Sequence, residues 1–496
     1  MKQRSRAVLQ NSSECHEIET AHGHFASPRI RRQPLSCVSR HVKADSPFSG
    51  SARIIGVHQA SPRGPNINNM YRIGTTLLLM LATAHAEQVR QPVADILVTA
   101  FHDKQWEVRY ELDNATNELV FARTPDESRR ETWLPDHGFE IVMTSQGEAV
   151  RRSDGAPFTT VRIRMSPEYR HLRNDYAPFS PFGGGGTLFH TGRFFACTQA
   201  CTGDATWSFT LWADPEDSIV LDGKYIPYST RWADTGSGRM VYVGKNKQLR
   251  AAEFTAIIDE AMPESVRGPL LSDLPALIRD FADRFGPLEE PLILFASYDS
   301  AHKQGWGRQG GTLPNQIFTH FYGAEWERRM QEPGFAFDLA WHFAHEAAHL
   351  YQLQRFSTEA GDSWIHEGAA EAFAALELHA RNEAASQAVA HKLDLARTAC
   401  AQDLGDRSMD EVLLGRDLSA AYSCGLLLNI YIDTKVRERT PDGLFAVWRE
   451  YLRRIAGNAP RTRNVYLDSI AHVGGAELAN KIRALLDAAH PNFELH

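Results

Sequence analysis

The chain has 496 residues, of which 43% are hydrophobic and 23% are charged. This is the composition of a globular protein with room for two or three domains. The formal net charge is -8; residues 1–69 hold 10 Lys and Arg against 4 Asp and Glu, or +6, so the remainder carries -8 - 6 = -14. Because phosphate binding needs a basic surface, this acidic body argues against nucleic acid as a partner.

A secretory signal peptide is predicted over residues 70–86. Arg72 gives a short basic region, an apolar run covers residues 73–82, and Ala84-His85-Ala86 forms a small-residue cleavage site. The run is shorter than the ~20 residues that span a bilayer. We therefore expect export to a bacterial periplasm or the medium, with no stable membrane anchor; a buried strand or helix is the alternative.

Residues 1–69 precede this signal and are rich in Arg, Ser, Pro and His without helical or strand periodicity. Since a signal peptide normally begins a chain, we expect translation to start at Met70. The alternative is that residues 1–69 form a disordered basic leader.

A β-rich domain is predicted over residues 87–262. Its candidate strands are short, rich in β-branched and aromatic residues, and separated by turn signals such as Asp113-Asn114 and Asp154-Gly155. They cover residues 95–101, 106–112, 117–122, 139–143, 160–165, 207–213 and 239–244. This pattern favours an antiparallel β-sandwich, with residues 181–186 ("PFGGGG") as a flexible loop.

The pattern becomes mixed and then helical over residues 263–496. Residues 270–285 have helical periodicity, and residues 291–298 and 315–323 look like strands. Further helices are predicted over residues 336–356, 364–381, 384–400, 416–437, 443–456, 461–472 and 475–489. We expect this segment to hold the chemistry of the protein.

The stretch "FAHEAAHLYQ" contains His345, Glu346 and His349 in H-E-x-x-H spacing. On a helix, residues four apart project from one face, so both imidazoles can reach one metal ion. Zinc bound by two histidines needs a third protein ligand. Glu367 supplies a candidate at the start of the next predicted helix, where Gly368 and its small neighbours allow close helix packing.

This arrangement resembles the gluzincins, zinc peptidases with H-E-x-x-H on one helix and a Glu ligand on the next. Trp364-Ile365-His366-Glu367-Gly368 fits the W-[LI]-x-E-G pattern of the aminopeptidase N group, with 17 residues before the Glu where that group has 18. The glycyl aminopeptidase family is a further relative, with a longer gap. The resemblance implies a β-sandwich followed by a thermolysin-like zincin domain that is helical toward its C-terminus.

By this resemblance one zinc ion per chain is held by His345, His349 and Glu367, and Glu346 is the general base toward a zinc-activated water. Tyr422-Ser423-Cys424-Gly425 stands where the group has Y-x-K-G, which makes Tyr422 the stabiliser of the oxyanion. Glu371, one turn after Glu367, is expected to orient a ligand histidine as a second-shell group. The expected partner is a peptide or protein substrate.

The resemblance lacks one element. Nothing matches the G-x-M-E-N strand, whose Glu holds the free amine of the substrate. The nearest strand candidate, residues 310–323, offers Asn315 and Gln316 but no acid. Cleavage at a chain end and internal cleavage both stay open, as do a zinc hydrolase acting on a non-peptide bond, such as an epoxide, and a non-catalytic peptide-binding zincin fold.

Four cysteines follow the predicted signal peptide. An even number in an oxidising compartment suggests two disulfides. We predict Cys197–Cys201 and Cys400–Cys424, because each pair lies within one predicted region. A metal or redox site at Cys197 and Cys201 is the alternative.

Overall fold

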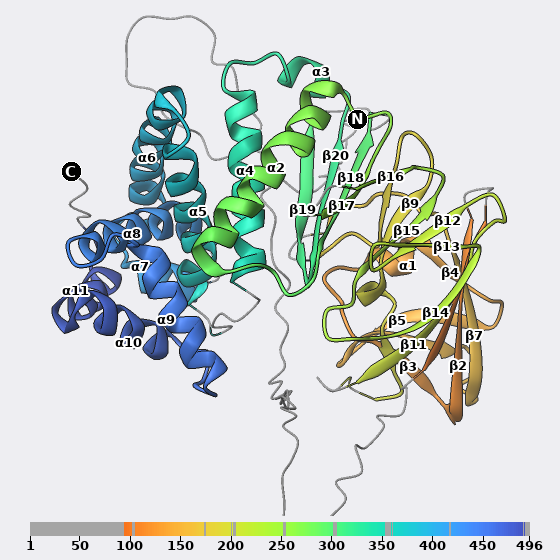
Figure 1. Cartoon of the computed structure of the whole chain (residues 1–496). Helices are drawn as coiled ribbons and strands as arrows, with labels where there is room; N and C mark the ends of the chain where they lie inside the picture. Colours follow the sequence, from red (N-terminus) through yellow and green to blue (C-terminus); the bar gives the residue numbers. More distant parts are fainter. Residues whose placement is uncertain are drawn as a thin grey trace, which may run out of the picture.

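The computed structural model describes residues 94–101, 105–172, 175–199, 201, 205–250, 254–300, 305–352, 359, 361–415, 418–489 and 491. The leader predicted over residues 1–69 and the signal peptide predicted over residues 70–86 lie outside these residues. Figure 1 shows a strand-rich part on the right, a helical part on the left, and a further sheet with two long helices between them. No helix in the described segments has both the length and the apolar character needed to cross a membrane.

A six-stranded sheet with the order β14-β11-β1-β2-β7-β4 begins the N-terminal part. Its strands are β1 (Asp95–Ala100), β2 (Trp106–Thr116), β4 (Trp133–Pro135), β7 (Phe158–Met165), β11 (Thr206–Trp212) and β14 (Ser229–Thr235). The predicted antiparallel arrangement is wrong for one pair, because β1 runs parallel to β11. Alternation within a strand indicates which face is buried, but not the direction of a partner far along the chain.

Two further sheets complete this part, with the orders β10-β3-β6-β5 and β13-β12-β15-β9-β8. Their strands are β3 (Glu118–Phe121), β5 (Phe139–Thr144), β6 (Gly147–Arg152), β8 (Phe179–Pro181), β9 (Thr187–His190), β10 (Ala196–Cys197), β12 (Ser218–Leu221), β13 (Lys224–Pro227) and β15 (Met240–Gly244). Helix α1 (Ser128–Thr132) and the short turn η1 (Thr191–Arg193) lie between strands. Side chains from all three sheets share one apolar core.

A mixed five-stranded sheet, in the order β16-β17-β18-β20-β19, joins the two halves of the molecule. Its strands are β16 (Gln248–Arg250), β17 (Phe254–Ile258), β18 (Leu292–Asp299), β19 (Gly307–Leu313) and β20 (Gln316–Tyr322). The predicted domain boundary after residue 262 falls between β17 and the next helix. Because β17 pairs in parallel with β18, this boundary divides the strands of the central sheet. Residues 310–323, taken above as one strand candidate, form a hairpin that turns at Asn315, whose φ of 57° Asn tolerates well.

Both faces of this central sheet are buried. Alternate residues on its strands belong to two different cores. Ala256, Leu294 and Ile317 belong to the core shared with the helices, and Ile257, Ile293 and Phe318 belong to the core shared with the strand-rich part. The glycine-rich loop strengthens this second contact, because the backbone N–H groups of Gly183 and Gly184 donate to Asp259, just after β17, over 2.6 and 2.8 Å.

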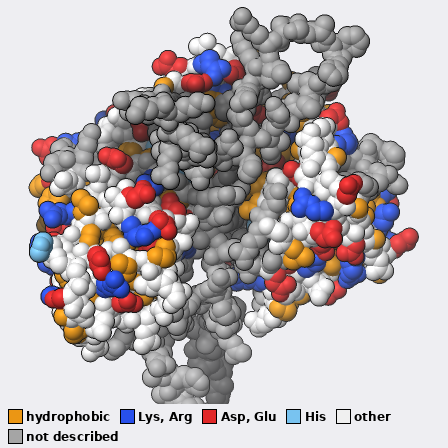
Figure 2. Space-filling view, turned by 180° about the vertical axis from the view of Figure 1, so that it is seen from behind, with side chains coloured by type: hydrophobic (Ala, Val, Ile, Leu, Met, Phe, Trp, Pro, Cys, Tyr) orange, Lys and Arg blue, Asp and Glu red, His pale blue; other side chains and the backbone are white. Residues whose placement is uncertain are grey.

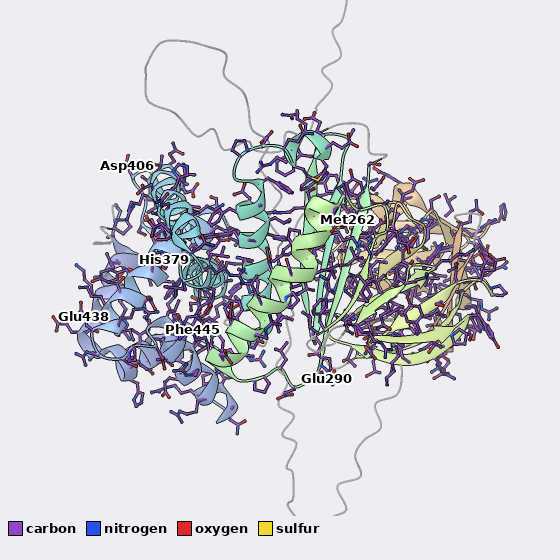
Figure 3. All side chains as sticks on the ribbon, turned by 45° about the horizontal axis from the view of Figure 1, so that its top comes forward. Met262, Glu290, His379, Asp406, Glu438 and Phe445 are labelled. Carbon is purple, nitrogen blue, oxygen red and sulfur yellow. A yellow bond between two sulfur atoms is a disulfide. The ribbon has the colours of Figure 1, made fainter. Side chains whose placement is uncertain are left out.

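Helices make up the rest of the described chain. They are α2 (Glu264–Phe285), α3 (Trp326–Arg329), α4 (Phe335–Tyr351), α5 (Ser363–His379), α6 (Glu383–Leu404), α7 (Met409–Leu414), α8 (Ser419–Arg437), α9 (Leu444–Ala456), α10 (Arg463–Gly474) and α11 (Ala476–Asp487). The predictions missed α3 and α7 and began α2 after Pro269. The prediction of helix over residues 353–356 lies outside the described residues. Phe445 of α9, labelled in Figure 3, contacts Phe285 of α2 and Phe373 of α5 and so joins the helical part to the central helices.

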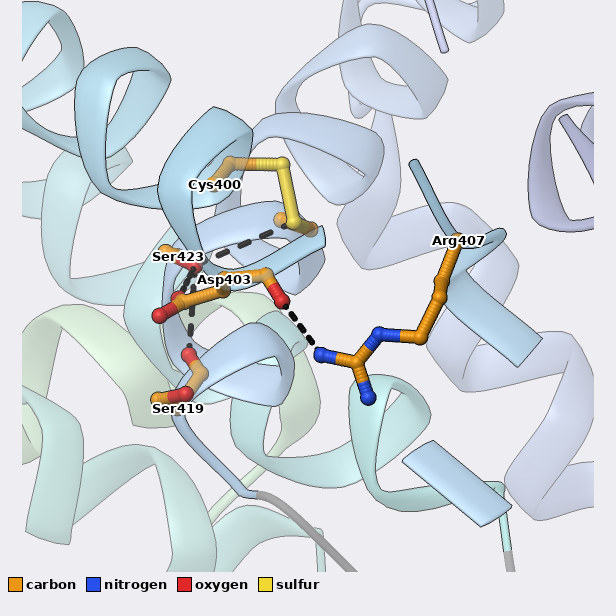
Figure 4. Close-up of a disulfide and its surroundings, with 6 residues drawn as sticks. Cys400, Asp403, Arg407, Ser419 and Ser423 are labelled. Atoms are coloured by element: carbon orange, nitrogen blue, oxygen red, sulfur yellow. Dashed lines mark hydrogen bonds between the residues drawn. A yellow bond between two sulfur atoms is a disulfide. The ribbon is translucent and has the colours of Figure 1, made fainter. Parts of the chain in front are cut away.

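Two disulfides are present, as predicted: Cys197–Cys201 and Cys400–Cys424. Figure 4 shows the second, which ties α6 to α8. Beside it the Ser423 hydroxyl donates to Asp403 over 2.7 Å. On the face of the molecule shown in Figure 2, acidic and basic side chains are interspersed over both halves.

Helices α5 and α8 cross at two glycines. A Cβ on Gly368 would lie 2.6 Å from the backbone of Gly425, and a Cβ on Gly425 would lie 2.9 Å from the Cα of Gly368. Only residues without a side chain allow this approach. The crossing brings the segment around Glu367 next to the segment around Tyr422, so the glycines of both sequence motifs have one structural explanation.

Replacing Gly425 by alanine is expected to lower the free energy of unfolding by about 1–3 kcal/mol, because the new methyl group meets backbone that cannot rotate away. Chemical unfolding followed by circular dichroism measures this. Gly268→Ala in α2 is the matched control, since its Cβ would meet only the end of the Glu264 side chain at 3.4 Å and alanine favours a helix. Equal stability of the two variants would contradict the close crossing.

Candidate metal centre

Helices α4 and α5 bring His345, His349 and Glu367 together in the interior. All three residues are buried, and one candidate ligand atom from each lies within 4.8 Å of the others. The Nε2 atoms of the two histidines are 3.0 Å apart. The Oε2 atom of Glu367 is 3.4 Å from His345 Nε2 and 3.5 Å from His349 Nε2. The three atoms therefore form a nearly equilateral triangle.

This triangle fits a tetrahedral zinc ion. Zinc with bonds of about 2.0–2.2 Å to nitrogen and oxygen holds its ligand atoms roughly 3.3–3.6 Å apart. In addition, no described residue donates a well-aligned hydrogen bond to the buried Oε2 of Glu367, which faces the two imidazoles. Two imidazoles and one carboxylate are the donor set of many catalytic zinc sites, which keep a fourth position open.

The electrostatic environment favours a cation. Burial alone would lower the pKa of His345, but the carboxylates of Glu367 and Glu371 outweigh burial and raise it to about 10. Burial would raise the pKa of Glu367, but His345 and His349 hold it well below its usual range. The carboxylates of Glu367 and Glu371 therefore favour a positive charge next to His345, which is a proton on the imidazole or, with the imidazole neutral, a metal ion bound to it.

Two residues behind the triangle contact the histidines. Nδ1 of His349 lies 2.7 Å from Oε1 of Gln352, whose own amide donates to the carbonyl of His366 over 2.9 Å. Because an amide oxygen only accepts, the proton of His349 is placed on Nδ1 and Nε2 keeps its lone pair for a metal. Nδ1 of His345 lies 3.0 Å from Glu371, which also accepts from Trp341 over 2.7 Å.

Glu346 points from α4 toward the central sheet and is fully buried. Its Oε2 accepts a hydrogen bond from Thr312 of β19 over 3.0 Å, whereas its Oε1 has no hydrogen-bond partner among the described residues. The backbone carbonyl of Thr312 accepts from Tyr176, which comes from the strand-rich part, over 3.3 Å. Thus β19 connects the strand-rich part with the candidate base.

Tyr422 of α8 lies beside the triangle, with its ring centroid 6.0 Å from that of His345. Two other histidines lie nearby. His342 lies 3.5 Å from Thr319, and His366 lies 3.6 Å from Glu367 Oε1. Asp338, in the first turn of α4, pairs with Arg329.

Sequence reasoning thus named the residues that the fold brings together and missed Gln352 and Thr312. Gln352 follows His349 by three residues, so helical spacing alone indicates that the two side chains lie on one face. Thr312 lies on another element, and no local pattern points to its contact with Glu346.

Solved structures similar to this fold include the M1 zinc metallopeptidase from Deinococcus radiodurans, at 15% identity and a TM-score of 0.46, over 82% of this chain and 97% of that chain. A mutant of that enzyme was solved with a Tyr-Ser-Ala substrate. Native leukotriene A4 hydrolase from Saccharomyces cerevisiae is similar at 12% identity and a TM-score of 0.49, over 82% of this chain and 69% of that chain.

No protein-family model matches the sequence, and no curated protein matches it. The structural neighbours are zinc metallopeptidases and leukotriene A4 hydrolases, the kind of protein to which the sequence motifs pointed. At these identities and TM-scores, the roles of individual residues must rest on the site itself.

Replacing Gln352 by leucine is expected to weaken zinc binding by about 10- to 100-fold, because the imidazole of His349 loses the acceptor that fixes its orientation. Competition with a chelator of known affinity measures the change. Gln387→Leu on the exposed side of α6 is the matched control. Unchanged zinc affinity in the Gln352 variant would show that this hydrogen bond does not support a metal site.

Proposed function

We propose that the protein is an exported zinc metallopeptidase, which holds one zinc ion with His345, His349 and Glu367 and hydrolyses peptide bonds. The triangle of buried ligand atoms is the observation that carries the proposal. Two disulfides support export, since such bonds persist in oxidising compartments. We assign the catalytic domain, with a thermolysin-like arrangement, to residues 263–496 together with β16 and β17.

Glu346 is the proposed general base. Thr312 holds one carboxylate oxygen, which fixes the orientation of the side chain. The other oxygen accepts no hydrogen bond from a described residue and can take the proton of an attacking water. The same carboxyl group then returns that proton to the amine that leaves.

Zinc bound at this site would polarise the scissile carbonyl and lower the pKa of a water molecule. Tyr422, whose ring centroid lies 6.0 Å from that of His345, is the proposed donor of a phenolic hydrogen bond to the oxygen of that carbonyl as negative charge develops there. Gln352 and Glu371 hold the two imidazoles in place, so these ligands need no rearrangement during the reaction.

The edge strand β19 is the proposed guide for the substrate. It ends the central sheet, and within the described part of the chain its only strand partner is β20. An extended peptide can add to such an edge through backbone hydrogen bonds. Since Thr312 of β19 touches Glu346, a peptide on this edge would run past the candidate base.

Replacing Glu346 by glutamine is expected to leave zinc bound but to lower kcat for peptide hydrolysis by about 10²- to 10⁴-fold, because the amide cannot accept the proton. Zinc content and turnover of a peptide library with free and blocked N-termini provide the two measurements. Glu477→Gln, on the exposed side of α11, is the control. Full turnover by the Glu346 variant would contradict the mechanism, and zinc binding without any turnover by the unmodified protein would favour a binding function.

Replacing Tyr422 by phenylalanine removes one hydroxyl group and no ring. We expect kcat to fall by about 10²- to 10³-fold with little change in KM, since the hydrogen bond forms mainly in the transition state. Steady-state kinetics on one cleaved peptide measures this. A rise in KM at constant kcat would instead place Tyr422 in ground-state binding.

A further inference from the structure

Arg308 is a buried arginine whose guanidinium has no partner among the described residues. The residue is only 8% exposed, and its Nε makes no hydrogen bond with a described residue. The other buried arginines of the described chain are paired: Arg129 binds Glu148 over 2.7 Å, and Arg193 binds Asp175 over 2.9 Å. Burying a charge without a partner is costly, so Arg308 is a candidate for binding a ligand of opposite charge.

Arg308 lies on the face of β19 that is directed toward the candidate metal centre. Side chains alternate along a strand, so Arg308, Gly310 and Thr312 share one face, and Thr312 donates to Glu346. Gly310 between them carries no side chain. Phe318 and Thr319 of β20 lie against this glycine. Arg308 and the contact of Thr312 with Glu346 are therefore on one face of β19, four residues apart along the strand.

Electrostatic coupling agrees with this placement. Burial lowers the pKa of Arg308 to about 10, while the carboxylates of Asp338 and Glu346 oppose the shift, so the group stays charged at neutral pH. Burial also lowers the pKa of His342, and the charge of Arg308 lowers it further. The carboxylates that act on the guanidinium therefore come from α4 and, through Glu371, from α5, the two helices that carry the candidate site, and Arg329 of α3 opposes them.

We propose that Arg308 is a specificity residue that binds a carboxylate of the substrate. A guanidinium binds a carboxylate through two parallel hydrogen bonds and repels an ammonium group. The carboxylate is either the free C-terminus of a short peptide or an Asp or Glu side chain near the scissile bond. The inference rests on the proposed peptidase function and names the chemistry that its substrate offers on β19.

The test compares kcat/KM for pairs of peptides that differ only in one carboxylate: free against amidated C-terminus, and Asp or Glu against Asn or Gln at each position around the cleaved bond. We expect the unmodified protein to prefer the carboxylate member of one kind of pair by about 10- to 100-fold, the range of a charged hydrogen bond. In Arg308→Gln this ratio should collapse toward one, and in Arg308→Lys it should persist in part. The kind of pair that responds identifies the source of the carboxylate.

If Arg308 has a purely structural role, its replacement will lower kcat/KM for both peptides of a pair equally and leave their ratio unchanged. That result would overturn the proposal. Arg483→Gln on the exposed side of α11 is the matched control. Calorimetric binding of the same peptides to Glu346→Gln and to Glu346→Gln with Arg308→Gln gives a second readout. If the unmodified protein cleaves no peptide, the proposed peptidase function fails. Carboxylate-dependent binding that Arg308→Gln removes would then still support the Arg308 site. If the peptides bind without regard to the carboxylate, the Arg308 proposal is overturned.

Discussion

The structure depends on burying negative charge beside two imidazoles. Glu346 and Glu367 are almost fully excluded from solvent, and Glu371 lies just behind them. Burying ionised carboxylates costs several kcal/mol per group unless positive charge compensates them. The Nε2 atoms of His345 and His349 face these groups and lie 3.0 Å apart. A divalent cation between them removes the conflict, because it attracts the carboxylate and both nitrogens at once.

The packing of α4, α5 and α8 produces that geometry. Helix α4 supplies two candidate ligands through its four-residue spacing, and α5 supplies the third candidate only if it runs very close to α4 and α8. The contact of Gly368 with Gly425 makes this approach possible, and the Cys400–Cys424 disulfide fixes α8 to α6 one residue away from the crossing. On the opposite side, β19 connects Glu346 through Thr312 to Tyr176 of the strand-rich part, which makes that part a wall of the site.

Much of the metal centre could be predicted because its signals are local. Helical periodicity alone places His345, His349 and Glu346 together, and the same spacing relates Glu371 to Glu367. What could not be predicted depends on long-range contacts. The parallel pairing of β1 with β11, the membership of β17 in the central sheet and the contact of Thr312 with Glu346 all join segments far apart in the chain. Arg308 gave no signal either, since an arginine in a strand is ordinarily an exposed, solvated residue.

The absence of a G-x-M-E-N sequence gains a physical meaning from the structure. The strand in question, β19, carries an unpaired cation instead of an acid on the face toward the site. The proposed role of Arg308 would reverse the selectivity of this strand for charge relative to an enzyme that holds a free amine. The strand-rich part contributes to the same edge, because Gln309 of β19 donates to the carbonyls of Leu172 and Asp175 over 3.1 and 3.2 Å.

The central claim is that one zinc ion lies between α4 and α5. Crystals of the zinc-loaded protein, measured above and below the zinc absorption edge, test it most directly. The account predicts a single strong anomalous peak per chain, at about 2.0–2.2 Å from Nε2 of His345, Nε2 of His349 and Oε2 of Glu367. A peak at another group of residues, or no peak at this triangle in protein saturated with zinc, would contradict it.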